Sequence, residues 1–261
     1  MDLQFEKYQG AGNDFIIIDD RKENFPDQDH SLIKKYCDRH FGIGADGLIL
    51  VRDSVISDFQ MLYFNADGQP GSLCGNGSRC VFAFANKHQI VFNEGTFETS
   101  DGIHKGSITN DNLICIEMGD VLKIQKRGSA IFVDTGSPHH LEFVDQVSGI
   151  DVKKKGAAVR YGAPYFDSGS NVNFIEKVNE KEFNIRTYER GVEDETLSCG
   201  TGAVAAAIGV HFSGQTSLNK ININALGGRL QVSFISDLGK YKNIQLIGPA
   251  TYVFSGNFMN K

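Results

Sequence analysis

The hydrophobic residues of this chain are grouped in many short segments, most of which have the character of β-strands. Residues 5–19 and 47–51 are rich in Ile, Leu and Val and predict strands. Residues 58–65 alternate well enough to predict another strand, which ends in the turn-forming sequence Ala66-Asp67-Gly68-Gln69-Pro70. Further strands are predicted at residues 96–100, 103–108, 113–118, 130–134, 141–144, 171–178, 182–189, 220–225, 229–234 and 243–247.

Fewer segments predict helices. Residues 30–39 predict a short helix with Asp29 as its N-cap. Two further segments are much more apolar: residues 80–88 continue a helix that starts behind Cys74, and residues 202–210 form a helix behind Cys199. Residues 203–210 have no polar face at all, so this second helix should be surrounded by protein.

The two cysteine segments belong to an internal repeat. Ser72-Leu73-Cys74-Gly75-Asn76-Gly77 and Leu197-Ser198-Cys199-Gly200-Thr201-Gly202 lie 125 residues apart. Gly12-Asn13-Asp14-Phe15 precedes Gly136-Ser137-Pro138-His139 by 124 residues. Residues 63–68 and 187–191 stand near the same offset. A period of this length indicates duplicated domains, since the units of a solenoid are far shorter.

These patterns predict an α+β fold. Strands outnumber helices and do not alternate regularly with them, and 29 glycines suit many tight turns. We expect two pseudo-symmetric domains, each a curled, mostly antiparallel, barrel-like sheet around a central apolar helix. The expected N-terminal domain covers residues 1–119 and is joined by the C-terminal segment 249–261, and the second domain covers residues 120–248. Both lengths fit ordinary domains.

Charge and hydropathy exclude several classes of partner. The net charge is −6 and no basic stripe is present, which argues against nucleic acid. The longest basic run, Lys153-Lys154-Lys155, is interpreted as a solvated loop. No apolar stretch reaches the ~18–20 residues that a membrane helix needs. The N-terminal sequence Met1-Asp2-Leu3-Gln4 lacks the regions of a signal peptide, so we expect a cytoplasmic protein.

The five cysteines are too few and too irregularly spaced for a disulfide framework. There is no Cys-x-x-Cys pair, so we expect no metal site, and we interpret Cys37, Cys80 and Cys115 as packing residues. Residues 200–205 fit the dinucleotide pattern Gly-x-Gly-x-x-Ala, but no Asp or Glu follows at the expected ~20 residues. The match to a dinucleotide-binding site is therefore weak.

Cys74 and Cys199 remain as candidates for chemistry. A thiol at a helix N-terminus meets unpaired backbone N–H groups and the positive end of the helix dipole, which favour its thiolate. Two such thiols can invert a weakly acidic carbon when they stand on opposite faces of it, each roughly 3–3.5 Å away and thus about 7 Å apart. Nearby backbone donors could stabilise the charge that develops on an adjacent carboxylate, by about 2.7–4 kcal/mol each.

The motifs closely resemble those of the diaminopimelate epimerase family, in the family's order and over nearly the whole chain. They are Gly10-Ala11-Gly12-Asn13-Asp14-Phe15, Phe64-Asn65-Ala66-Asp67-Gly68, Cys74-Gly75-Asn76-Gly77-Ser78-Arg79-Cys80, Tyr188-Glu189-Arg190-Gly191, Cys199-Gly200-Thr201-Gly202-Ala203 and Gly248-Pro249-Ala250-Thr251. The resemblance implies a cofactor-independent epimerase that converts LL-diaminopimelate to the meso form for lysine and peptidoglycan synthesis. It also implies two barrel-like domains with the active site in the cleft between them, usually in a homodimer.

The resemblance assigns roles to individual residues. Cys74 and Cys199 match the two catalytic cysteines, and His139 and Glu189 match groups that tune the two thiols. Arg190 would grip the distal carboxylate through two parallel hydrogen bonds. The residues that match substrate-binding positions are Asn13, Asn65, Gly75, Asn76, Ser137, Asn171, Glu189, Arg190, Gly200 and Thr201.

The chain departs from the family pattern at three places. Ser137 stands where the family often has asparagine, and Gly47 stands where some members have a binding glutamine. One extra residue lies between Glu189 and Cys199. Ser137 is shorter than asparagine and reaches less far, and Gly47 could offer only its backbone.

Other interpretations stay open at this point. Both cysteines could be small buried hydrophobic residues, which is the commonest fate of cysteine. A related two-domain isomerase is a second possibility, such as a proline racemase or a phenazine-biosynthesis-type isomerase. Arg190 with Asn65 and Asn171 favours a substrate with two carboxylates over proline. A thiol-redox or amino-acid-binding protein is a third, and it would bind a ligand without exchanging its α-hydrogen.

Overall fold

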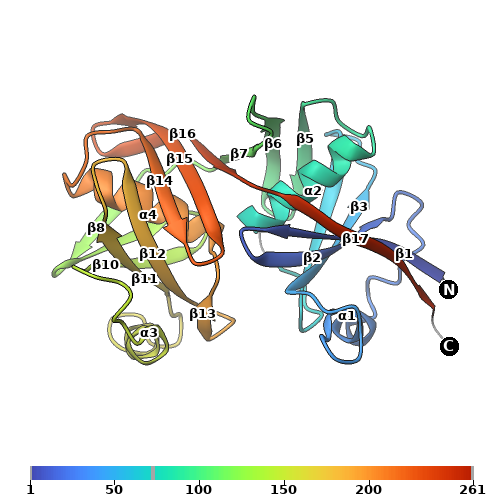
Figure 1. Ribbon diagram of the computed structural model, residues 1–261, viewed down its shortest axis with the longest axis horizontal. Coiled ribbons are helices and arrows are strands. Elements are labelled where there is room, and N and C mark those ends of the chain that lie inside the picture. Colours follow the sequence, from blue (N-terminus) through green and yellow to red (C-terminus); the bar gives the residue numbers. More distant parts are fainter. Residues whose placement is uncertain (1, 72–73, 260–261) are drawn as a thin grey trace. The chain divides into compact units, whose positions relative to one another are not determined.

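The computed structural model describes residues 2–71 and 74–259, so Ser72 and Leu73 of the first cysteine segment lie outside the described residues. The chain divides into two compact units, Met1–Ile116 with Gly248–Lys261 and Glu117–Ile247. The sheets in both units are mostly antiparallel, and helices are few (Figure 1).

The first unit begins with the antiparallel pair β1 and β2, and its described residues form the helices α1 and α2. Strands β2 and β3 are parallel, β3 and β4 antiparallel, and β4 and β5 parallel, and the hairpin of β5 and β6 follows. The C-terminal strand β17 returns to pair with β1. The elements are β1 (Asp2–Gly10), β2 (Asn13–Asp19), α1 (His30–Cys37), β3 (Gly47–Arg52), β4 (Phe59–Asn65), α2 (Gly75–Lys87), β5 (Glu94–Thr99), β6 (Gly102–Ile108), β7 (Ile114–Met118) and β17 (Thr251–Met259).

The second unit repeats this order of pairings. Strands β10 and β11 are parallel, β11 and β12 antiparallel, and β12 and β14 parallel, and the antiparallel pair of β14 and β15 follows. The shared topology agrees with the internal repeat of the sequence. The elements are β8 (Ile124–Arg127), β9 (Ala130–Asp134), β10 (Pro138–Phe143), α3 (Val152–Tyr161), β11 (Asn171–Lys177), β12 (Glu182–Glu189), β13 (Asp194–Thr196), α4 (Gly200–Phe212), β14 (Lys220–Ala225), β15 (Gly228–Asp237) and β16 (Lys240–Gly248).

One apolar helix packs against the strands of each unit. Helix α2 contacts β1, β2, β3, β6 and β17, and α4 contacts β9 to β12, β14 and β15. The expectation that the second helix is surrounded by protein is confirmed, since every residue from Ala203 to Val210 is buried. Gly209 allows this close packing, because a Cβ added there would lie 2.3 Å from Leu141 Cδ1.

Two expectations about local structure are wrong. Residues 5–19 do not form one strand, because Ala11 and Gly12 adopt positive φ values of 55° and 86° and turn the chain between β1 and β2. Lys153-Lys154-Lys155 is not a loop but lies in α3. Asp151 caps this helix, and its carboxylate accepts the backbone N–H of Lys154 at 3.0 Å.

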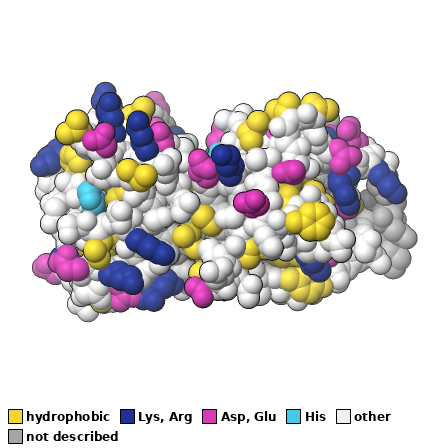
Figure 2. All heavy atoms as spheres, turned by 90° about the horizontal axis from the view of Figure 1, so that it is seen from above, with side chains coloured by type: hydrophobic (Ala, Val, Ile, Leu, Met, Phe, Trp, Pro, Cys, Tyr) yellow, Lys and Arg dark blue, Asp and Glu magenta, His cyan; other side chains and the backbone are white. Residues whose placement is uncertain are grey.

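The predicted α1 is confirmed with its cap, since the Asp29 side chain accepts the backbone N–H of Leu32 at 3.0 Å. On the face drawn in Figure 2, positive and negative side chains are interspersed and form no single-sign stripe. Within residues 2–71 and 74–259, no helix is long and apolar enough to cross a membrane.

Candidate active site

Cys74 and Cys199 occupy the same structural position in the two units. Each is the N-cap of its helix, with extended backbone angles of φ −107°, ψ 109° at Cys74 and φ −120°, ψ 115° at Cys199. Cys74 Sγ accepts the backbone N–H of Gly77 at 3.4 Å, and Cys199 Sγ accepts that of Gly202 at 3.4 Å. Each sulfur therefore receives a donor from the first turn of a helix, as the sequence predicts.

Local packing requires glycine at the donor position of the second site. A Cβ added to Gly202 would lie 2.8 Å from Asn173 Oδ1 and 3.3 Å from Cys199 Sγ. A larger residue would push the helix away from the sulfur or displace the Asn173 amide. The Gly-polar-Gly spacing thus brings the backbone close to the thiol.

Asn13 and Asn76 lie beside Cys74. Asn13 Oδ1 accepts from Cys74 Sγ at 3.7 Å and from Asn76 Nδ2 at 3.3 Å. Asn76 is 1% exposed, and its Oδ1 accepts from Arg79 Nη2 at 2.7 Å. Gly75 is buried at the first position of α2. The structure therefore brings Asn13, Cys74, Gly75 and Asn76 together in the first unit.

Arg79 was not predicted as a site residue, yet it is fully buried. Its guanidinium also donates to Gly75 O at 3.1 Å and to Pro249 O at 3.3 Å. Burial lowers the pKa of Arg79 to about 10, which still leaves the side chain charged at neutral pH.

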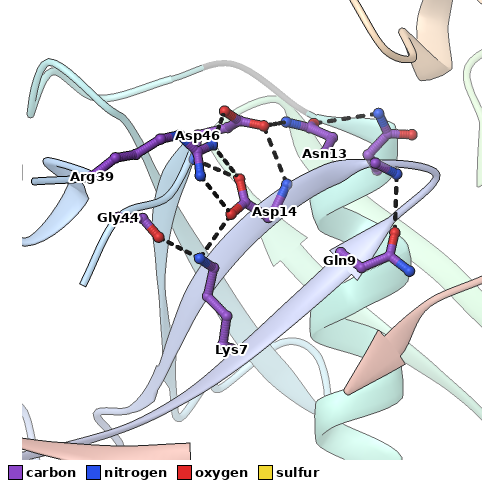
Figure 3. A network of polar contacts seen from close by, with 9 residues as sticks. Lys7, Gln9, Asn13, Asp14, Arg39, Gly44 and Asp46 are labelled. Atoms are coloured by element: carbon purple, nitrogen blue, oxygen red, sulfur yellow. Dashed lines mark hydrogen bonds and ion pairs between the residues drawn. The ribbon is translucent and has the colours of Figure 1, made fainter. Parts of the chain in front are cut away.

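An ionic network holds Asn13 from the other side (Figure 3). Asn13 Nδ2 donates to Asp46 Oδ2 at 2.6 Å, and Arg39 Nη2 bridges Asp46 and Asp14 at 2.7 Å each. Lys7 Nζ pairs with Asp14 at 2.7 Å and also donates to Gly44 O. Burial alone would raise the pKa of Asp14, but hydrogen bonds and charges from Arg39 and Lys7 lower it to about 2.

His139 and Thr201 lie beside Cys199. Thr201 Oγ1 is 3.4 Å from Cys199 Sγ and 3.0 Å from His139 Nε2. His139 Nδ1 lies 3.1 Å from Asn173 Nδ2. Burial and the charge of Arg190 lower the pKa of His139 to about 3, so this imidazole is neutral.

A third group gathers around Asn171 in the second unit. Asn171 Nδ2 donates to Ser137 Oγ at 3.2 Å, and Asn171 Oδ1 accepts the backbone N–H of Arg190 at 2.9 Å. The Arg190 side chain is exposed and donates to Ser168 O at 2.9 Å. Glu189 is half-buried, and its Oε2 accepts from Thr196 Oγ1 at 2.9 Å.

Among the described residues, no hydrogen bond joins Asn65 to the group around Cys74. It is exposed at the end of β4, where it pairs in register with Gly47. A Cβ added to Gly47 would lie 2.6 Å from Phe64 O, so no side chain fits at this position.

Three residues with clear contacts to the candidate site were missed: Asp46, Arg79 and Asn173. Arg79 is a charged residue five positions after Cys74 in an apolar helix, and Asn173 is a polar residue in a strand whose Val172, Phe174 and Ile175 are buried. Both were detectable as polar exceptions in apolar segments. Within the described residues, no cluster of three His, Cys, Asp or Glu side chains could hold a metal ion.

Comparison with known proteins gives a consistent result. The family model described as Diaminopimelate epimerase matches residues 5–124 and 131–253. A protein named Diaminopimelate epimerase from Flavobacterium psychrophilum is 50% identical over 252 residues, covering 97% of this chain and 98% of its own length. A second protein of that name, from Chlorobaculum tepidum, is 40% identical and covers 95% of this chain and 98% of its own length.

Solved structures with low sequence identity share the fold. A phenazine biosynthesis protein of the PhzF family from Bacillus anthracis is 14% identical, with a TM-score of 0.81 and 100% coverage of both chains. A probable proline racemase from Agrobacterium radiobacter is 15% identical, with a TM-score of 0.71, 99% coverage of this chain and 93% of its own. These likenesses confirm the expected α+β fold class of two curled, mostly antiparallel domains.

Proposed function

The chain belongs to the diaminopimelate epimerase family, and from that premise we propose that it interconverts LL- and meso-diaminopimelate without a cofactor. The observation that carries this proposal is the equivalent placement of Cys74 and Cys199. Each sulfur caps a buried helix and receives a backbone N–H at 3.4 Å. Two equivalent thiols are what inversion by a two-base mechanism needs.

The reaction moves one proton at each face of the α-carbon. One sulfur, as thiolate, takes the α-proton, so a C–H bond breaks and an S–H bond forms. The other sulfur, as thiol, gives its proton to the opposite face, so an S–H bond breaks and a C–H bond forms. No electron is gained or lost overall. The mechanism requires the two sulfurs to face one carbon, each at roughly 3–3.5 Å.

The charge that develops on the α-carboxylate needs donors. We assign this role to the first-turn N–H groups of Gly75 and Asn76 in α2 and of Gly200 and Thr201 in α4. The dipoles of both helices have the sign that stabilises an anion. His139 and Glu189 are proposed to tune the thiols, and the neutral state of His139 supports its action as a hydrogen-bond partner rather than a cation.

Polar side chains would hold the rest of the substrate. We propose that Asn13, Asn65 and Asn171 bind its polar groups, and that Ser137 acts by orienting Asn171, to which it is bonded at 3.2 Å. Arg190 is exposed and its backbone N–H is fixed by Asn171, so its guanidinium can reach the distal carboxylate. We propose that Glu189 binds the substrate together with Arg190.

The cellular setting is proposed from the family alone. The reaction would serve lysine and peptidoglycan precursor synthesis in the cytoplasm, and the protein would act as a homodimer. No nucleic acid or membrane partner is proposed.

Exchange of the α-hydrogen tests the proposed reaction directly. The protein is incubated with LL- or meso-diaminopimelate in D₂O, and mass spectrometry follows deuterium at the α-carbon. We expect deuterium in both isomers and conversion toward one mixture from either side. L-Proline serves as the control substrate and should exchange no hydrogen. Absence of exchange with both diaminopimelate isomers contradicts the proposal.

Arg190→Ala is expected to raise KM for diaminopimelate about 10–100-fold with little change in kcat, because charged hydrogen bonds contribute ~1.5–3 kcal/mol. Arg190→Lys keeps the charge but loses the parallel pair of bonds, so its KM should lie between those of the wild type and the alanine variant. Steady-state kinetics with both isomers measures the effect. An unchanged KM in Arg190→Ala would place the distal carboxylate elsewhere.

A further inference from the structure

The two sulfurs receive the same bond from their helices but different bonds from side chains. The backbone N–H of Gly77 and that of Gly202 each lie 3.4 Å from their sulfur, so the helix contribution to the thiolate is matched. Cys74 has an amide oxygen as a side-chain neighbour, and Cys199 has a hydroxyl. Whether the neighbouring group donates to the sulfur or accepts from it depends on the other hydrogen bonds that orient that group.

The amide of Asn13 is fixed from both ends. Both Asp46 carboxylate oxygens accept hydrogen bonds, from Asn13 Nδ2 and from Arg39, so the NH₂ group of Asn13 must face Asp46. At the other end, Arg79 can only donate, so Asn76 Oδ1 faces Arg79 and Asn76 Nδ2 faces Asn13. Each end independently leaves Asn13 Oδ1 as the acceptor at Cys74 Sγ.

An acceptor next to sulfur favours the thiol. Asn13 Oδ1 lies 3.7 Å from Cys74 Sγ and can accept an S–H hydrogen. A thiolate at Cys74 would instead face the lone pairs of an oxygen that cannot turn away. Hydrogen bonding to the neutral form disfavours ionisation.

At Cys199 the chain of bonds runs in the opposite direction. Asn173 Nδ2 donates to His140 O at 3.1 Å, and a backbone carbonyl can only accept, so the NH₂ group of Asn173 also faces His139 Nδ1 at 3.1 Å. Thr187 Oγ1 donates to the remaining Asn173 Oδ1 at 2.9 Å. The neutral imidazole of His139 therefore carries its proton on Nε2.

This tautomer decides the direction of the Thr201 hydroxyl. His139 Nε2–H donates to Thr201 Oγ1 at 3.0 Å, so the hydroxyl hydrogen is left for Cys199 Sγ at 3.4 Å. Cys199 thus receives a hydroxyl donor in addition to the backbone donor. Hydrogen bonds to the ionised form favour the thiolate.

We propose that Asp46 and Asn173 are positioning residues that set opposite protonation states in the substrate-free protein, a thiol at Cys74 and a thiolate at Cys199. The inference deepens the proposed function, because it states which of the two sulfurs is ready to act as the base. It concerns the protein without substrate and is measured without turnover.

Charged and titratable groups lie near both sites. Arg79, Cys80, Asp14, Lys7, Arg39 and Asp46 lie around the first site, and the neutral His139 and the cation of Arg190 lie around the second. Arg79 acts against the proposal, since a cation favours a thiolate at Cys74. However, its guanidinium hydrogens point at Gly75 O, Asn76 Oδ1 and Pro249 O, whose dipoles offset its field. Arg190 supplies a cation to the second site, so each site has one nearby. The difference in protonation between the two sulfurs therefore depends on their hydrogen bonds.

Alkylation against pH reads the two thiols separately in one molecule. The substrate-free protein is treated with iodoacetamide between pH 5 and 10, and peptide mass spectrometry gives the rate at Cys74 and at Cys199. The apparent midpoints belong to the pair if the sulfurs interact. We expect the Cys199 midpoint to lie at least about one unit below that of Cys74. Coincident midpoints, or the reverse order, overturn the proposal.

Two isosteric variants test the positioning residues. Asp46→Asn can donate as well as accept, so only Asn76 still holds the Asn13 amide in place. With one of its two constraints removed, Asn13 Oδ1 should accept less firmly from Cys74 Sγ, and the Cys74 midpoint should fall. The control Asp19→Asn removes an exposed carboxylate that pairs with Arg21, and it should change neither midpoint. Asn173→Asp presents an acceptor to His139 Nδ1, which moves the ring proton away from Nε2 and should raise the Cys199 midpoint.

A second pair of variants tests the hydrogen bond from the Thr201 hydroxyl to Cys199 Sγ without changing any charge. Thr201→Val should raise the Cys199 midpoint by about one unit, whereas Thr201→Ser keeps the hydroxyl and should leave it in place. Unchanged midpoints in both Thr201→Val and Asp46→Asn overturn the proposal. If the order of midpoints holds but α-hydrogen exchange fails, the proposed function is wrong and the protonation assignment stands.

Discussion

Replacing Cys74 or Cys199 with alanine is expected to lower kcat for epimerisation by at least about 10³-fold, because a positioned acid or base contributes ~10²–10⁴-fold and inversion needs both. Either variant lacks a group on one face of the α-carbon, so the remaining sulfur can only return a proton to the face from which it came. Chiral chromatography of the products measures the loss. Near-normal turnover in either variant would show that the two-base assignment is wrong.

Cys37→Ala is the matched control. Cys37 is buried in α1, and burial raises the pKa of its thiol to about 12, so it cannot act as a base near neutral pH. This variant should keep the wild-type kcat. Its free energy of unfolding is the only property that we expect to fall. Circular dichroism of all three variants should show the wild-type fold, since Cys74 and Cys199 are only half-buried.

The helices of the candidate site could be predicted because their signal is local. The sequence from Ala203 to Val210 has no polar face, and a helix of that kind has to be buried. A cysteine immediately before Gly-polar-Gly marks the point at which such a helix begins. These features need no knowledge of distant residues, and α2 and α4 begin where they indicate.

Helix α3 was missed because its local pattern is misleading. Three consecutive lysines dominate the segment, and only Val152 and Gly156 are buried. Gly156 is disfavoured in a helix by its backbone entropy, yet it is what permits α3 to pack on β12. A Cβ added there would lie 2.3 Å from Tyr188 Cβ.

The partners of the sulfurs could not be predicted because they depend on register. Asn173 reaches His139 and His140 only because β10 and β11 run parallel, with His139 opposite Asn171 and Leu141 opposite Asn173. Asp46 reaches Asn13 in the same way, through the parallel pair of β2 and β3. The repeat thus preserves the position of each cysteine, whereas the side chains that contact the sulfur differ between the halves.

Arg79→Ala is expected to destabilise the protein by at least about 3 kcal/mol, because each buried acceptor left unsatisfied costs ~1–3 kcal/mol and truncating a large core side chain to alanine costs ~2–5 kcal/mol. The buried guanidinium joins α2 to the chain 170 residues away, at Pro249 O, and it holds Asn76 at 2.7 Å. In the part of the chain that the structure describes, no carboxylate pairs with this buried cation, so three carbonyl acceptors must compensate for the lost water.

Urea unfolding measures this effect, with Arg21→Ala as the control. Arg21 pairs with Asp19 at the surface, with both side chains more than a third exposed at 39% and 38%, so its loss should shift the midpoint little. Arg79→Lys should recover only part of the stability, since a single ammonium cannot satisfy three acceptors in the geometry of a guanidinium. A midpoint for Arg79→Ala equal to that of Arg21→Ala would mean that these acceptors find other donors. The buried arginine would then have no structural role at the start of α2.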